Sequence, residues 1–147
     1  MAIERNAHAT WEGDLRNGSG QFDLESSEAI SGEAVTFASR FEPESGGRTS
    51  PEELIAAAHS TCFSMALANG LAEDGHPPTR LDTDAQVTLD NTGSGFAITK
   101  IQLTVRGQVD GLDESGFRKA AEQAKQNCPV SKALASVPEI TLDAALA

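Results

Sequence analysis

Basic residues are scarce in this chain: 11 Lys and Arg stand against 22 Asp and Glu, which gives a formal net charge of -11 over 147 residues. A surface of this charge repels phosphate backbones and anionic membranes, so we expect no nucleic-acid partner and no membrane partner. No continuous run approaches the roughly 18 apolar residues that a membrane-spanning helix needs. The polar first residues carry no apolar leader segment, and we therefore expect a cytoplasmic protein.

Cysteine is also scarce, since Cys62 and Cys128 are the only two. They form no Cys-x-x-Cys pair, and the three histidines make no acidic cluster. Metal ligation by His59, Cys62 and Cys128 is therefore a weak alternative, and we expect no metal and no other cofactor. Thiols are held reduced in the cytoplasm, so a disulfide between these two would be transient and catalytic, not a structural link.

The length and composition predict one domain, residues 1–147, because a chain of this size can bury a sizeable core. Period-two alternation and turn residues predict a hairpin at 8–11 and 21–24, a strand at 34–41 that ends near Arg40, paired strands at 84–89 and 96–109 with a bulge near Thr99, and a closing strand at 140–146. Strands and helices alternate in blocks, which favours an α+β fold with a mostly antiparallel sheet.

Two helices are predicted beside these strands. The first begins with Ser50 as N-cap, Pro51 at the first helical position and Glu53 completing a capping box. Its expected buried stripe consists of Leu54, Ala58, Cys62, Met65 and Ala66. The second begins at Asp113 and buries Phe117, Ala120, Ala121 and Ala124, with Cys128 continuing that face until Pro129 starts a short further helix.

The two thiols can either fill space in a packed core, as free cysteines commonly do, or cycle between dithiol and disulfide. Cys128 precedes Pro129 at a helix N-terminus, where backbone N–H groups favour a thiolate, so the residues alone make Cys128 the more acidic thiol. For Cys62 to react first, a cation must stabilise its thiolate, and Arg40 is the candidate. Glu52 is the carboxylate best placed in sequence to hold that arginine. A hydrolase that pairs Cys62 with His59 is a further alternative, although no third orienting group is evident.

Two long segments carry a family resemblance: TSPEELIAAAHSTCFSMA at 49–66 and AKQNCPVS at 124–131. With the shorter strings TWEGD at 10–14, RFE at 40–42, GFAITKI at 95–101 and EITLD at 139–143, they resemble the OsmC/Ohr family of thiol-dependent peroxidases, and the OsmC branch in particular. The resemblance implies that Cys62 is the peroxidatic cysteine and Cys128 the resolving one, which reverses the order expected from acidity. It also implies that Arg40 activates the sulfur and Glu52 fixes the arginine. Arg16 lies in the region from which the Ohr branch draws its arginine.

The same resemblance implies a fold of mostly antiparallel sheets packed on two long central helices in an intertwined homodimer, with active sites at the subunit interface. The implied reaction reduces organic hydroperoxides, with hydrogen peroxide as a second candidate substrate, through a Cys62 sulfenic acid that Cys128 resolves as a disulfide. An external dithiol, either a small thiol or a lipoyl- or thioredoxin-like protein, would then restore both thiols. No flavin, haem or metal is implied.

Overall fold

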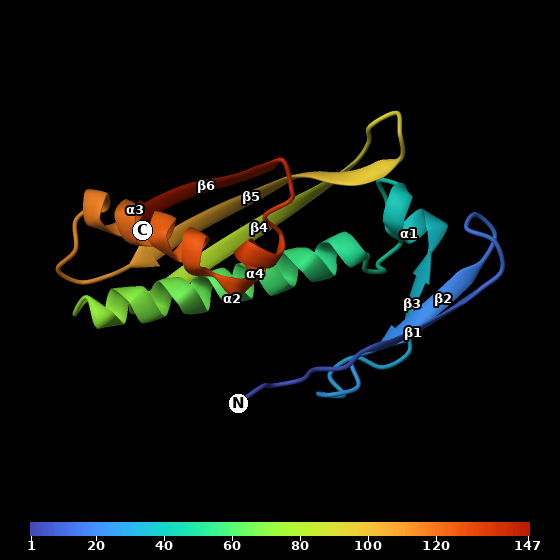
Figure 1. Cartoon of the computed structure of the whole chain (residues 1–147), viewed down its shortest axis with the longest axis horizontal. Helices are drawn as coiled ribbons and strands as arrows, with labels where there is room; N and C mark the ends of the chain where they lie inside the picture. The colour runs from blue at the N-terminus through green and yellow to red at the C-terminus, as the bar shows by residue number, and fades with distance from the viewer. The chain divides into compact units, whose positions relative to one another are not determined.

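The computed structural model describes residues 1–147 and divides into two compact units, Met1–Leu54 and Ile55–Ala147, each of which is described by itself. Strands and helices alternate along the chain in blocks (Figure 1). Two three-stranded sheets, one in each unit, give the α+β architecture that the sequence predicts. Three of the four strand pairings are antiparallel, so the expectation of mostly antiparallel sheets is confirmed.

The first unit is built on an antiparallel meander of β1 (His8–Glu12), β2 (Ser19–Asp23) and β3 (Glu33–Thr36). The predicted hairpin is confirmed, but its connection lies earlier than the sequence suggested, because Ser19 and Gly20 already pair with β1. Asp14 organises this connection by accepting hydrogen bonds from the backbone amides of Arg16 and Asn17.

The strand predicted at 34–41 is wrong in its second half. After β3 the chain turns into a short helix, α1 (Phe37–Phe41). Thr36 Oγ1 accepts from the Ser39 backbone N–H, and Ser39 Oγ accepts from the Thr36 N–H, so the two residues form a reciprocal capping box. This local pair gives the backbone an alternative to sheet pairing, and it places Arg40 on a helix and not at a strand end.

The long helix α2 (Pro51–Glu73) begins where the sequence predicts. Ser50 Oγ accepts a hydrogen bond from the Glu53 backbone N–H at 3.2 Å, which is the N-cap interaction expected of that serine. By length and composition alone α2 would also pass as a membrane span, a test that the core helix of any globular protein can meet. Only 22% of its most apolar stretch is buried within the chain.

The second unit packs helices on a sheet of β4 (Arg80–Asn91), β5 (Phe96–Gln108) and β6 (Glu139–Leu146). β4 and β5 form an antiparallel hairpin in which Thr88 pairs with Lys100 and Leu89 with Ile98, so Thr99 is the extra residue of the predicted bulge. β6 pairs with β5 in parallel, which the sequence did not predict. α3 (Glu114–Asn127) and α4 (Pro129–Ala133) connect β5 to β6.

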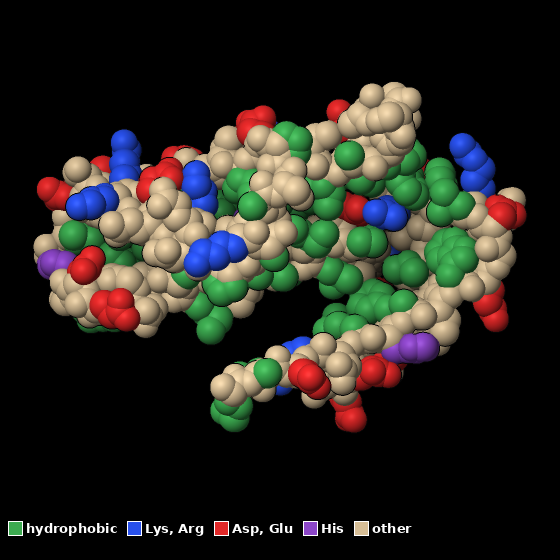
Figure 2. All heavy atoms as spheres, viewed as in Figure 1, with side chains coloured by type: hydrophobic (Ala, Val, Ile, Leu, Met, Phe, Trp, Pro, Cys, Tyr) green, Lys and Arg blue, Asp and Glu red, His purple; other side chains and the backbone are tan.

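The core of this unit joins α2, α3 and β5 (Figure 1). The buried residues of α2 within it are Phe63, Leu67 and Leu71, and His59 lies on the same helical face. The buried stripe predicted through Ala58 and Met65 is therefore wrong: both are exposed, and Met65 keeps 69% of its accessible surface. Apolar side chains consequently lie on the open surface of α2 (Figure 2). The predicted buried face of α3 is confirmed at Phe117, Ala121 and Ala124, with Ala120 partly buried.

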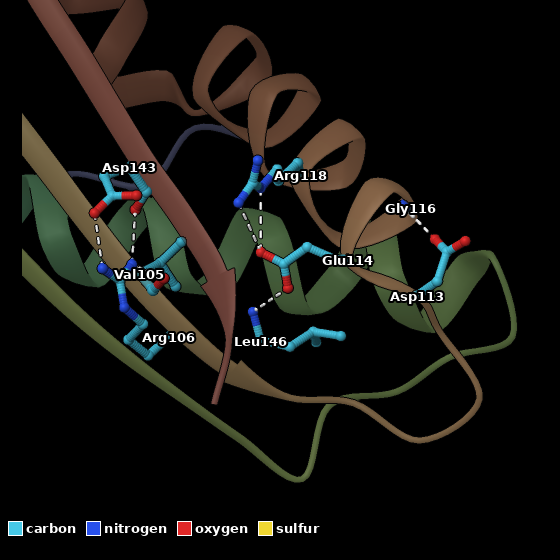
Figure 3. Close-up of polar contacts among 8 residues, drawn as sticks. All are labelled: Val105, Arg106, Asp113, Glu114, Gly116, Arg118, Asp143 and Leu146. Carbon is cyan, nitrogen blue, oxygen red and sulfur yellow. Dashed lines mark hydrogen bonds and ion pairs between the residues drawn. The ribbon is translucent and has the colours of Figure 1, made fainter.

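Polar contacts fix the start of α3 against β6 (Figure 3). Asp113 caps the helix by accepting from the Gly116 backbone N–H at 2.7 Å, as the sequence predicts. Glu114 accepts from Arg118 through one carboxylate oxygen and from the Leu146 backbone N–H through the other. These bonds hold the first turns of α3 against β6.

Candidate functional site

Cys62 and Cys128, sixty-six positions apart in sequence, interact directly in the second unit. Cys62 lies in the middle of α2 and is partly buried, whereas Cys128 lies between α3 and α4 and is completely buried. Both are free thiols, Cys62 packs against the core cluster that contains Cys128, and each side chain lies close enough to shift the pKa of the other. This contact is what a reversible disulfide requires.

The surroundings of the two sulfurs shift their acidity in opposite directions. Burial raises the pKa of the Cys62 thiol, and the neighbouring Cys128 raises it further. A hydrogen bond from the Val130 backbone amide lowers this pKa, but by less than the other effects raise it. Burial also raises the pKa of Cys128, but hydrogen bonds from the Ser131 amide, the Cys62 thiol, the Ser131 hydroxyl and the Val130 amide outweigh it. The pKa of Cys128 is therefore below its usual value. Within this chain Cys128 is therefore the more acidic of the two thiols, as its position before Pro129 predicts.

A shallow apolar hollow of about 660 Å³ opens beside Cys62. The residues that line it come almost entirely from α2, with one contribution from the start of α4: Ala57, Ala58, Thr61, Cys62, Met65, Ala66 and Pro129. The thiol of Cys62 therefore meets apolar surface, whereas Cys128 has no exposed surface of its own. Of the two sulfurs, only Cys62 can meet a molecule arriving from solvent.

In the first unit, Arg40 and Glu52 form the ion pair that the sequence predicts. Arg40 Nη2 donates to Glu52 Oε1 at 2.8 Å, and Arg40 Nε donates to both carboxylate oxygens at 3.2 and 3.3 Å. The Glu52 side chain is only 10% exposed and that of Arg40 39%, so the carboxylate anchors a guanidinium that still reaches solvent. Arg16 instead stacks its guanidinium over the Phe37 ring, 5.0 Å from the centroid.

The sequence pattern did not reveal a second polar pair in the second unit. His59, fully buried on α2, meets Ser131 of α4, with 2.7 Å between His59 Nε2 and Ser131 Oγ. His59 Nδ1 is buried without a hydrogen-bond partner, and burial lowers the pKa of the ring, which favours neutral imidazole. The usable signal was positional: His59 lies three residues before Cys62 and Ser131 three after Cys128, so contact between the cysteines brings these neighbours together as well.

No group of three or more His, Cys, Asp or Glu side chains is arranged to hold a metal ion. The imidazole that the metal and hydrolase alternatives both need is hydrogen-bonded to Ser131 through Nε2. Neither alternative gains support from these contacts.

Comparison with known proteins places this chain in a family. The family model described as OsmC-like protein matches residues 44–143. The chain is 48% identical over 143 residues to Peroxiredoxin OsmC of Escherichia coli strain K12, which covers 97% of this chain and 96% of that protein. It is 30% identical over 102 residues to the organic hydroperoxide resistance protein-like 2 of Staphylococcus epidermidis, covering 68% of this chain and 70% of that protein.

Solved structures share the fold at lower identity. An organic hydroperoxide resistance protein from Elizabethkingia anophelis superposes with a TM-score of 0.72 at 24% identity and full coverage of both chains. OhrB of Bacillus subtilis gives a TM-score of 0.69, also at 24% identity, over 97% of this chain and 98% of that one. At these identities the likeness concerns the fold.

Proposed function

The chain belongs to the OsmC-like protein family, and from that premise we propose that it is a thiol-dependent peroxidase that reduces organic hydroperoxides to alcohols. The observation that carries the proposal is the pair of neighbouring free thiols formed by Cys62 and Cys128. On this proposal residues 1–147 work as one OsmC-like domain, which the nearly complete coverage by the Escherichia coli relative supports.

The proposed reaction begins at Cys62, because its sulfur borders the open hollow and that of Cys128 does not. The Cys62 thiolate attacks one peroxide oxygen, the O–O bond breaks, and an alcohol leaves while Cys62 becomes a sulfenic acid. Cys128 then attacks the Cys62 sulfur, and a disulfide and water form. The apolar lining of the hollow favours substrates with an organic group, while hydrogen peroxide remains a second candidate substrate.

Acidity within one chain opposes this order, because the pKa of Cys62 is raised and that of Cys128 lowered. The proposal therefore needs a cation at Cys62, and Arg40 takes that role. A guanidinium beside the sulfur would move the shared proton toward Cys128 and leave the thiolate on Cys62. Glu52 would hold the guanidinium in place through the bonds described above.

We propose that Arg40, held by Glu52, acts on the Cys62 of a second copy packed on α2, so that the homodimer completes the site. The exposed apolar face of this helix supports such a homodimer.

The proposed cycle needs an external dithiol, since each turnover oxidises both thiols and the chain holds no other cysteine. A small thiol or a lipoyl- or thioredoxin-like protein has the required chemistry. Because the cycle depends on a compartment that keeps such donors reduced, we also propose a cytoplasmic location.

The test is a single turnover of the reduced full-length protein with one equivalent of cumene hydroperoxide, followed by intact mass. The wild type should lose two hydrogen atoms and regain them with dithiothreitol. Cys62→Ser should consume no peroxide, while Cys128→Ser should consume one equivalent and gain an oxygen atom that dimedone traps. Cysteines that only pack would give no mass change. A Cys62–His59 hydrolase would turn over an ester without reductant, and either outcome would overturn the proposal.

A further inference from the structure

The pair formed by His59 and Ser131 has no role in the cycle proposed above, yet it touches the reacting sulfurs. Ser131 Oγ lies 2.7 Å from His59 Nε2, and the same hydroxyl lies close enough to Cys128 to help lower the pKa of that thiol. His59 has no exposed surface and Ser131 has 7%. The hydroxyl therefore bridges a buried imidazole and a buried thiol away from water.

The hydrogens available in this bridge fix its direction. A serine hydroxyl carries one hydrogen, and it stabilises the Cys128 thiolate only when that hydrogen is directed at the sulfur. The short contact to His59 must then be a bond that Nε2–H donates to Ser131 Oγ. In this tautomer Nδ1 is a bare acceptor, which agrees with its lack of a partner, because an unpaired acceptor is better tolerated in the interior than an unpaired N–H donor.

We propose that His59 and Ser131 are positioning residues for the resolving step: His59 Nε2–H holds the Ser131 hydroxyl so that its hydrogen points at the Cys128 sulfur. The inference rests on the proposed peroxidase cycle, in which Cys128 must attack as a thiolate. It assigns the imidazole an orienting role, not that of a base.

The bridge matters most after peroxide has reacted. Within one reduced chain, without a cation at Cys62, the Cys62 thiol also helps to hold the Cys128 thiolate. Once Cys62 is a sulfenic acid that S–H donor is gone, and the Ser131 hydroxyl is the remaining side-chain donor to Cys128. An electron pair of the Cys128 thiolate then forms the S–S bond, and the S–O bond of Cys62 breaks. Its electrons leave with the hydroxide, which takes up one proton and becomes water; this proton balances the one that Cys128 released when it became a thiolate.

The experiment separates the two chemical steps in the full-length reduced protein. Rapid mixing with one equivalent of cumene hydroperoxide, followed by acid quench at set times, measures peroxide loss, dimedone-trapped sulfenic acid and disulfide. Ser131→Ala should form the disulfide about tenfold more slowly, the loss expected for one hydrogen bond to a charged group, and sulfenic acid should accumulate. Ser131→Thr, which keeps a hydroxyl, should stay within about threefold of wild type. Peroxide loss itself should not slow in either variant.

Two His59 variants test the imidazole. His59→Gln keeps a side-chain N–H donor and should retain most of the resolving rate, whereas His59→Leu removes the donor and should slow disulfide formation. Ser64→Ala is the matched control, because Ser64 also lies on α2 near Cys62 but bonds to Ser60 and Thr83. It should match wild type in both steps.

A second measurement does not depend on peroxidase activity. In a Cys62→Ser background, the thiolate absorbance of Cys128 near 240 nm should titrate at higher pH when Ser131→Ala is added, and at an unchanged pH when Ser64→Ala is added. An unshifted titration, or disulfide formation by Ser131→Ala within about twofold of wild type, would overturn the inference. If the wild type consumed no hydroperoxide, the proposed function would fail, and the titration would still decide whether Ser131 stabilises the Cys128 thiolate.

Discussion

Replacement of Met65 by glutamine should weaken self-association of this protein. Met65 is 69% exposed and is one of the residues that line the apolar hollow on α2, so a second copy that packs on this helix would cover it. Glutamine has nearly the same length and no charge, so the change removes apolar character without much change of shape. It leaves the core face of α2, which contains Phe63 and Leu67, untouched.

The expected magnitude follows from the exposed fraction. Complete burial of a methionine side chain contributes about 1.5 to 3 kcal/mol, so the exposed 69% of Met65 corresponds to about 1 to 2 kcal/mol in each copy. A two-fold interface repeats every contact, which doubles the effect to about 2 to 4 kcal/mol per dimer. The dissociation constant should therefore rise by roughly 30- to 1,000-fold.

Sedimentation velocity over a dilution series, with dithiothreitol present to prevent disulfides between chains, measures this constant. Gln126→Ala, an exposed change on α3, is the control and should leave it unchanged. If Met65→Gln dissociated within about threefold of wild type, or if the wild type were monomeric at every concentration, the assignment of this face to a second copy would be wrong.

Three further predictions concern the ion pair, the buried histidine and the core. Arg40→Ala should slow the reaction of Cys62 with hydroperoxide by about tenfold or more, measured by rapid mixing, because the thiolate loses its cation; an unchanged rate would refute the proposed activation. The pKa of His59 is lowered in the folded protein, so the imidazole of the unfolded chain binds a proton more readily. The free energy of unfolding, measured with urea, should therefore fall as the pH drops below 6.5, by up to about 1.4 kcal/mol per pH unit. The fall should be smaller in His59→Gln. Gly107→Ala would place a methyl group against the fully buried Phe117 ring and should destabilise the protein by about 1 to 3 kcal/mol in chemical denaturation, whereas an unaffected midpoint would contradict this packing.

Features whose physical cause is local were predictable from the sequence. Ser50 and Asp113 cap their helices as expected, because a capping side chain acts on a backbone amide only three residues away. The bulge at Thr99 was predictable because the alternation of apolar residues changes phase there. The ion pair of Arg40 with Glu52 was also expected, although the backbone that carries Arg40 was not.

The helix α1 shows where local pattern fails. The alternation of Val35, Phe37 and Phe41 is typical of a strand. It gives no sign of the hydrogen bonds between Thr36 and Ser39 that favour a helix instead. The usual capping-box sequence has glutamate or glutamine at the third helical position, and Ser39 makes the same reciprocal bond there. Two side-chain hydrogen bonds therefore outweigh a weak preference for the strand.

The buried face of α2 could not be selected from sequence for a different reason. The helix has apolar residues on most of its circumference, so spacing alone allows a stripe through Ala58 and Met65 as well as one through Phe63 and Leu67. Packing against the sheet determines which of the two stripes is buried within the chain, and the buried stripe is the one with the larger side chains. The stripe left open borders Cys62, so the surface proposed to admit substrate is continuous with the surface proposed to bind a second copy. If both proposals hold, assembly brings a second copy to the face of α2 that borders Cys62, which makes peroxide reduction depend on association.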